Sequence, residues 1–224
     1  MSLRALSLLE ARVLGVLIEK AHTVPDSYPL SLNALTLGCN QKTARDPVLS
    51  ASESEVQDAA NALKLLSLVF ESSGSRVSRY EHNLGRALGL PSQSVALLAV
   101  LMLRGPQTIS ELRANSERLH RFADLSAVEG FLDELAARPE EKGGPLVLRL
   151  ARAPGAREAR WAQLLGGPVA TTGAEAGARD DGEDFVPLSE LGALKARLAT
   201  AEGEIAALRA QLDRVCAELD IPRS

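Results

Sequence analysis

Residues 52–81 read SESEVQDAANALKLLSLVFESSGSRVSRYE, and this stretch decides the fold. It opens with Ser52 and Glu55 at the spacing of a capping box, in which two side chains satisfy backbone N–H groups at a helix start. Apolar residues then recur every three or four positions, which predicts an amphipathic helix. Two short extended runs flank the Ser/Gly turn near Gly74, which predicts a β-hairpin directly after the helix.

Two helices are predicted before this stretch. Residues 6–21 carry apolar side chains at helical spacing, and the segment from Pro25 to Pro29 ends that helix because proline cannot continue it. A short leucine-rich helix and a polar stretch from Cys39 to Val48 follow. Three helices and a hairpin form the winged-helix variant of the helix-turn-helix unit.

The same order recurs in the next part of the chain. Ser92 is predicted to cap an apolar helix that Gly105 and Pro106 end, and Thr108 with Glu111 forms a second capping box. A third helix is predicted over 126–138, and a second hairpin turns at Pro154 and Gly155. The fold class is therefore mainly α with small β-hairpins (α+β), as two tandem winged-helix domains.

The remaining residues differ in composition. The stretch after the second unit is rich in Gly, Ala, Thr and acids and predicts a flexible linker. The tail carries a heptad repeat typical of a coiled coil, and the alternative is a helix that packs back on the domains. The predicted organisation is 1–88 winged-helix domain one, 89–166 winged-helix domain two, 167–187 acidic linker and 188–221 coiled-coil helix. The predicted dimerisation residues are Leu191, Leu194, Leu198, Ile205, Leu208, Leu212, Val215 and Leu219.

Composition narrows the function classes. Hydrophobic residues make up 46% of the chain but aromatic residues only 3%, which favours helical cores of Leu, Val and Ala. The net charge of -4 comes from the tail: residues 167–224 hold 6 basic and 11 acidic side chains, against 9 and 9 in 1–88 and 10 and 9 in 89–166. The longest apolar run is too short to span a bilayer, and Cys39 and Cys216 lie far apart, so we expect no membrane partner and a cytoplasmic location.

Several motifs resemble one known family. The motifs are YPLSLNAL from Tyr28, CNQKTARDPV from Cys39, SEVQDA from Ser54, RYEH from Arg79 and RGPQT from Arg104, together with the Arg-Trp pair at 160–161. They are similar, in this order, to the YceH family of bacterial proteins, and the resemblance covers nearly all of residues 6–166. It implies two winged-helix domains in a cytoplasmic bacterial protein and implies no assigned activity.

The polar stretch between the second and third helices is the first candidate site. Its side chains are of the types that hydrogen-bond base edges or phosphates, and the alternative is a loop that satisfies its own backbone. The candidate nucleic-acid-binding residues here are Asn40, Gln41, Lys42 and Arg45.

The second hairpin is the other candidate site. Arginines cluster around its tip, where they suit phosphate or minor-groove contacts, and the alternative is a solvated surface paired with Glu158. Further positive charge lies between the second and third helices of this unit. The candidate residues are Arg149, Arg152, Arg157 and Arg160, with Arg113, Arg118 and Arg121 nearby.

Other patterns limit these hypotheses. The third helix of the first unit begins with Glu53, Glu55 and Asp58, and these carboxylates would face phosphates in a DNA groove. The histidines have no ligand spacing, and we identify no nucleophile–base pair and no phosphate-binding glycine loop, so we predict no metal, no cofactor and no catalytic activity. Trp161 is expected to be a core residue.

Two functions remain open. The first is a DNA-binding, regulatory protein that forms a homodimer through its tail and contacts DNA mainly through the second hairpin. The second is a protein-interaction module in which the winged helices bind a protein partner.

Overall fold

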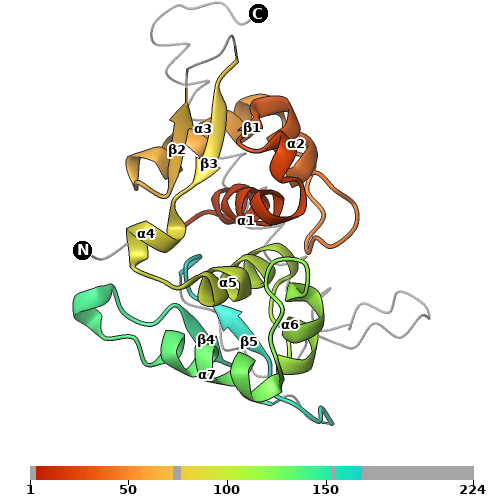
Figure 1. Ribbon diagram of the computed structural model, residues 1–224, viewed down its shortest axis with the longest axis vertical. Coiled ribbons are helices and arrows are strands. Elements are labelled where there is room, and N and C mark those ends of the chain that lie inside the picture. The colour runs from red at the N-terminus through yellow and green to blue at the C-terminus, as the bar shows by residue number, and fades with distance from the viewer. Residues whose placement is uncertain (1–3, 73–76, 153–154, 168–224) are drawn as a thin grey trace, which may run out of the picture. The chain divides into compact units, whose positions relative to one another are not determined.

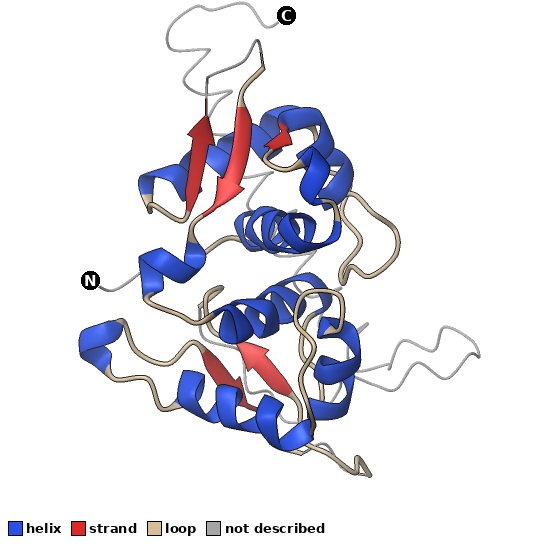
Figure 2. Ribbon diagram, in the orientation of Figure 1, coloured by secondary structure: helices blue, strands red, loops and turns tan. Residues whose placement is uncertain are grey.

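The computed structural model describes residues 4–72, 77–152 and 155–167. The predicted coiled-coil helix with its heptad leucines, and the predicted linker after residue 167, lie outside the described residues, as do the predicted turn residues Gly74 and Pro154. The described residues belong to one compact unit. They form an α+β structure of helices and small antiparallel sheets (Figures 1 and 2).

The first half contains three main helices and a three-stranded antiparallel sheet in the order β1-β3-β2. In β2 and β3 the pairing runs from Val69 opposite His82 to Ser72 opposite Arg79. The elements are α1 (Leu8–Thr23), the 3₁₀ helix η1 (Pro25–Ser27), β1 (Leu30–Ser31), α2 (Leu32–Cys39), α3 (Glu53–Leu65), β2 (Val69–Ser72) and β3 (Arg79–His82).

The second half repeats this order after a short connecting helix. Its hairpin pairs β4 with β5, and Gln107 forms an isolated antiparallel bridge with Trp161 at the position that β1 holds in the first half. The strand order is therefore the same in both halves. The elements are α4 (Leu84–Leu88), α5 (Ser92–Arg104), α6 (Ile109–Ser116), α7 (Leu125–Ala136), the 3₁₀ helix η2 (Glu140–Lys142), β4 (Val147–Arg149) and β5 (Trp161–Gln163).

Helix capping confirms part of the sequence prediction. Both predicted capping boxes are present: Ser52 with Glu55 begins α3, and Thr108 with Glu111 begins α6. The predicted cap at Ser92 is wrong, because Ser92 is the first helical residue of α5 and Pro91 holds the cap position. Proline suits this boundary because its fixed φ is compatible with the extended backbone there and its missing N–H removes a donor.

The two halves share one hydrophobic core. Helices α1 and α5 pack against each other at its centre, where a Cβ at Gly15 would lie only 3.0 Å from Leu103. Helix α3 packs on α1, and α7 packs on α5, so the two central helices separate α3 from α7 (Figure 1). The N–H of Leu6 also donates to the carbonyl of Leu165 across the halves, at 2.7 Å.

Two helical glycines give a matched test of this packing. A Cβ at Gly38 of α2 would lie 2.6 Å from Cγ1 of Val16 on α1, whereas nothing lies within 4 Å of the same atom at Gly130 of α7. We expect Gly38→Ala to lower the free energy of unfolding by about 1–3 kcal/mol through overpacking.

We expect Gly130→Ala to raise the free energy of unfolding by roughly 0.5–1 kcal/mol, because alanine restricts the unfolded chain and favours helix. Urea unfolding of both variants measures the contrast. Equal effects of the two substitutions would contradict the close contact between α1 and α2.

Candidate nucleic-acid interface

The polar loop between α2 and α3 is organised around Arg45. Its side chain is completely buried, and its Nη2 lies 2.6 Å from Oε2 of Glu19 on α1. Nη1 donates to the second Glu19 oxygen and to the Ala44 carbonyl. Nη2 donates to Oε2 of Glu19 and to Oε1 of Gln41. Nε donates to the Gly38 carbonyl. A guanidinium has five N–H donors, and all five are occupied here.

Two other predicted loop residues are also used internally. Asn40 forms two hydrogen bonds with the backbone of Ala51. Its Nδ2 donates to the Ala51 carbonyl at 2.7 Å, and its Oδ1 accepts the Ala51 N–H at 2.8 Å. Gln41 accepts from Arg45. Lys42 is exposed. The loop brings the four predicted residues together, but it leaves only Lys42 free to meet a phosphate.

Arg12 is a second buried guanidinium, and its burial was not predicted from the sequence. It lies on α1 with no exposed surface, where Nη1 donates to the Cys39 carbonyl at 3.1 Å and Nη2 donates to the Pro47 carbonyl at 2.6 Å. Burial, and then the charge of Arg45, lower the pKa of Arg12. The sequence does hold a signal, because position 12 is three residues after Leu9 and four before Val16, on the apolar face of the helix.

The four predicted arginines of the second hairpin divide into two pairs. Arg149 lies over the Trp161 ring, 5.9 Å from its centroid, and 4.0 Å from Glu129 of α7. Arg160 donates to the Pro106 carbonyl at 2.9 Å and lies 3.3 Å from Glu111 of α6. Both guanidiniums therefore join the hairpin to the helices beside it.

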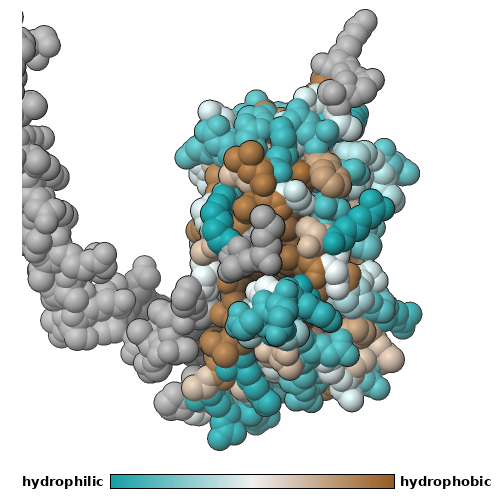
Figure 3. Space-filling view, turned by 90° about the vertical axis from the view of Figure 1, so that its left-hand side faces the viewer, coloured by the Kyte–Doolittle hydropathy of each residue, from teal (hydrophilic) through white to brown (hydrophobic). Residues whose placement is uncertain are grey.

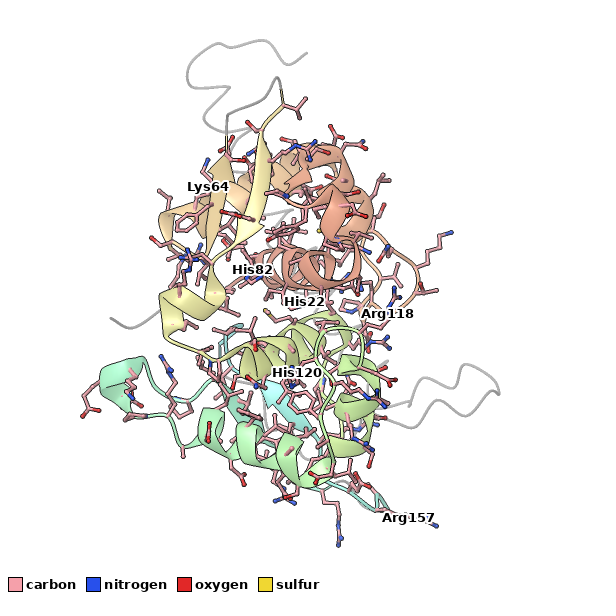
Figure 4. The ribbon with its side chains drawn as sticks, viewed as in Figure 1. His22, Lys64, His82, Arg118, His120 and Arg157 are labelled. Atoms are coloured by element: carbon pink, nitrogen blue, oxygen red, sulfur yellow. The ribbon has the colours of Figure 1, made fainter. Side chains whose placement is uncertain are left out.

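Arg152 and Arg157 lie on the part of the hairpin that projects beyond these contacts. Both are exposed, and neither has a hydrogen bond or ion pair among the described residues. Figure 4 shows Arg157 directed away from the body of the second half. Trp161 is only 2% exposed, which confirms it as a core residue.

A hollow between α6 and α7 adds to this surface. It has a volume of about 360 Å³ and was not predicted as a site, although its arginines belong to the basic segment that the sequence shows. It is lined by Ser110, Arg113, Ala114, Glu117, Arg121, Phe122 and Leu125.

The third helix of each half presents carboxylates. On α3, Glu53 accepts from Nδ2 of Asn33, Glu55 belongs to the capping box, and Asp58 is exposed. On α7, Asp133 and Glu134 are exposed. Helix α3 would therefore bring negative charge towards phosphates if its first turns entered a groove, whereas the first turn of α7 carries no acidic residue.

Metal and membrane features are limited in the described residues. No group of three or more His, Cys, Asp or Glu side chains lies close enough there to hold a metal ion. Burial, and then the neighbouring His22, lower the pKa of His82 to about 4. Within the same residues, no helix has the length and apolar character needed to cross a bilayer.

Comparisons with known proteins define the family. Residues 6–156 match the model of the family described as "Protein of unknown function, DUF480". This chain belongs to that family. The resemblance to the YceH family is consistent with this membership.

Bacterial relatives match over most of their length. A UPF0502 protein of Methylibium petroleiphilum is 64% identical over 205 residues, which cover 91% of this chain and 85% of the relative. A UPF0502 protein of Burkholderia multivorans is 61% identical over 220 residues, which cover 98% of this chain and 92% of the relative. The DUF480 family relationship therefore extends over both repeats.

Arg45 and Lys42 allow a test of the loop. Because Arg45→Gln removes the main partner of the largely buried Glu19 carboxylate and leaves it only Lys20, whose Nζ lies 3.4 Å from Oε2, we expect the free energy of unfolding to fall by about 3 kcal/mol. The exposed neighbour Lys42 provides the control, and Lys42→Gln should change stability by no more than about 0.5 kcal/mol. Urea unfolding at neutral pH measures both. An Arg45 variant as stable as the Lys42 variant would contradict the buried pair.

The same pair predicts a pH dependence. Burial raises the pKa of Glu19, but hydrogen bonds and charge from Arg45 outweigh it, so the pKa lies below the ordinary 4.5. A lowered pKa in the folded state stabilises the protein above the unfolded pKa, and this stabilisation disappears as pH falls through the folded value. We therefore expect wild type to be more stable than Glu19→Gln at neutral pH. The difference should shrink as the pH falls below the ordinary value of 4.5; urea unfolding at neutral and at acidic pH would show a constant difference if the pair were absent.

Proposed function

We propose that this DUF480 protein consists of two winged-helix units and binds duplex DNA through its phosphate backbone, with the second unit leading. The proposal includes a regulatory, non-catalytic role in the bacterial cytoplasm. Dimerisation through the heptad leucines of the tail remains a prediction about residues outside the described ones.

The repeated topology supports the winged-helix assignment. Each half has a first helix, a short strand or bridge, two further helices and a hairpin, and in each the first strand pairs with the last one. Winged-helix proteins that bind DNA place helices and hairpins of this kind against the duplex. Fold alone does not assign a function, so the side chains must support the assignment.

The observation that carries the proposal is the pair of free guanidiniums on the second hairpin. Arg152 and Arg157 are exposed without partners among the described residues, while Arg149 and Arg160 hold the base of the hairpin. Phosphate contacts of this kind supply sequence-independent affinity and release counterions. The hairpin thus exposes two positive charges, while contacts at its base fix its position against the helices.

The helices point to backbone binding rather than base reading. The first turn of α3 carries Glu53 and Glu55, and Asp58 follows them exposed. The carboxylates Asp133 and Glu134, by contrast, lie at the end of α7. The shared α1–α5 core also separates the two helices. We therefore expect little sequence preference, and a contact dominated by the second hairpin.

A protein partner is the second candidate function, and one observation favours it. Leu65 at the end of α3 is 89% exposed and Leu37 on α2 is 65% exposed, so the first half presents apolar side chains to solvent. Figure 3 shows apolar side chains gathered along the middle of one face. Exposed apolar side chains mark an interaction site where they form a contiguous patch.

The DNA proposal is tested by binding of a mixed-sequence duplex at increasing salt. We expect Arg152→Gln with Arg157→Gln to weaken binding equally across sequences. The slope of log K against log salt should fall by about two, because two phosphates are no longer neutralised. Arg86→Gln removes an exposed arginine on α4, away from the hairpin, and serves as the control. Fluorescence anisotropy between roughly 50 and 200 mM salt measures the slope.

The result separates the two functions. Wild-type protein that shows no salt-dependent binding to duplex DNA would refute the DNA proposal. Loss of a captured protein partner in Leu65→Ser, with DNA binding unchanged, would instead assign the first half to protein interaction.

A further inference from the structure

The hollow beside α7 is part of the same surface as the second hairpin. Ser110, one of its lining residues, donates from Oγ to Oε1 of Glu158 at 3.3 Å. Glu158 directly follows Arg157, one of the two free arginines. The hydrogen bond between Ser110 and Glu158 therefore joins the edge of the hollow to the residue next to Arg157.

One face of α6 forms a wall of the hollow. Ser110 lies three and four residues before Arg113 and Ala114, and Glu117 lies four and three residues after them, which places the four on the same side of a helix. The turn before α7 supplies the opposite side, with Arg121 exposed at its edge. Two guanidiniums from separate segments thus border one open space.

Both guanidiniums have donors left for a ligand. Nη2 of Arg113 donates to the Ala123 carbonyl at 3.1 Å, which holds the turn and leaves four N–H groups unused. Arg121 has no hydrogen bond or ion pair among the described residues. Glu117 is the only carboxylate among the lining residues, so the lining has a net positive charge.

We propose that this hollow seats a backbone phosphate of the duplex that the hairpin arginines contact, with Arg113 and Arg121 as its ligands. The proposal rests on the proposed function, and it extends the DNA contact from the hairpin to α6. Guanidiniums bind phosphate oxygens through two parallel hydrogen bonds. Ala114, Phe122 and Leu125 give the hollow an apolar part that can accommodate the carbon atoms of the adjoining sugar.

Glu117 gives the proposal a second, opposite consequence. Its carboxylate borders the same space and repels a phosphate seated there. Removing this charge should strengthen DNA binding, whereas removing Arg121 should weaken it. If DNA were attracted only by general positive charge, removing any exposed charge would change its affinity. If the hollow binds one phosphate, removing the charge of Arg121 or Glu117 should change the affinity, and removing a distant charge should not.

The test measures duplex binding against salt for the full chain. Arg121→Gln should reduce the slope of log K against log salt by about one, and Glu117→Gln should tighten binding. Arg86→Gln on α4 is the matched control for loss of one positive charge and should leave the slope unchanged. Among the described residues the side chains of Arg86, Glu117 and Arg121 have no hydrogen bond or ion pair, so thermal unfolding should give wild-type midpoints for all three variants.

The outcomes distinguish this inference from the function it extends. If Arg121→Gln behaves as Arg86→Gln while the hairpin variant still lowers the slope, the protein binds DNA but the hollow seats no phosphate. Unchanged or weaker binding by Glu117→Gln also overturns the phosphate seat. If wild type shows no salt-dependent binding, both proposals fail.

Discussion

The contact between α1 and α5 is the constraint on which the rest of the structure depends. Neither half has an independent apolar centre, because both first helices face the same core. Gly15 permits the approach, since a side chain there would meet Leu103 at once. The carbonyl of Leu103 also accepts the N–H of Asp46, so the long loop of the first half is fixed to the second. The contact between α1 and α5 therefore fixes the position of the surface of one half relative to the other.

The same constraint explains why two arginines, Arg12 and Arg45, are buried. The loop between α2 and α3 packs beside the core with few apolar side chains, and its backbone carbonyls need donors. Arg12 and Arg45 provide them from α1 and from the loop itself. Only Arg45 has a carboxylate partner, which makes the loop depend on Glu19. These residues are polar in sequence, yet they serve the interior.

The sequence predicts those structural features that depend on residues close to one another in the chain. Capping at Ser52 and Thr108, the order of helices and the burial of Trp161 follow from spacing over a few positions, and the structure confirms them. The short β1, the connecting helix α4 and the pairing of Gln107 with Trp161 were not predicted, because each depends on a distant strand or helix. Sequence spacing does not report such contacts.

The candidate site follows the same division. The exposure of Arg152 and Arg157 could be predicted from the sequence, because charge beside a hairpin turn needs no distant partner; their role in binding stays a prediction. Arg45 could not be assigned correctly to surface or interior, because its burial depends on Glu19, 26 residues earlier. The hollow escaped prediction as well, since its lining comes from α6, the turn and α7 together.

The distribution of charge also bears on how this fold meets a partner. Helices α3 and α7 keep their carboxylates exposed, while the arginines with free donors lie on the second hairpin and the turn before α7. A carboxylate that faces a phosphate is unfavourable in any register, so if the proposed DNA contact forms, an acidic helix in the groove would oppose the affinity that we assign to the hairpin. Contact along the backbone avoids that opposition, because the hairpin and turn can approach phosphates while α7 stays outside the groove. Under the proposed DNA binding, the acidic first turn of α3 therefore restricts the geometry of the contact and leads us to expect low sequence preference.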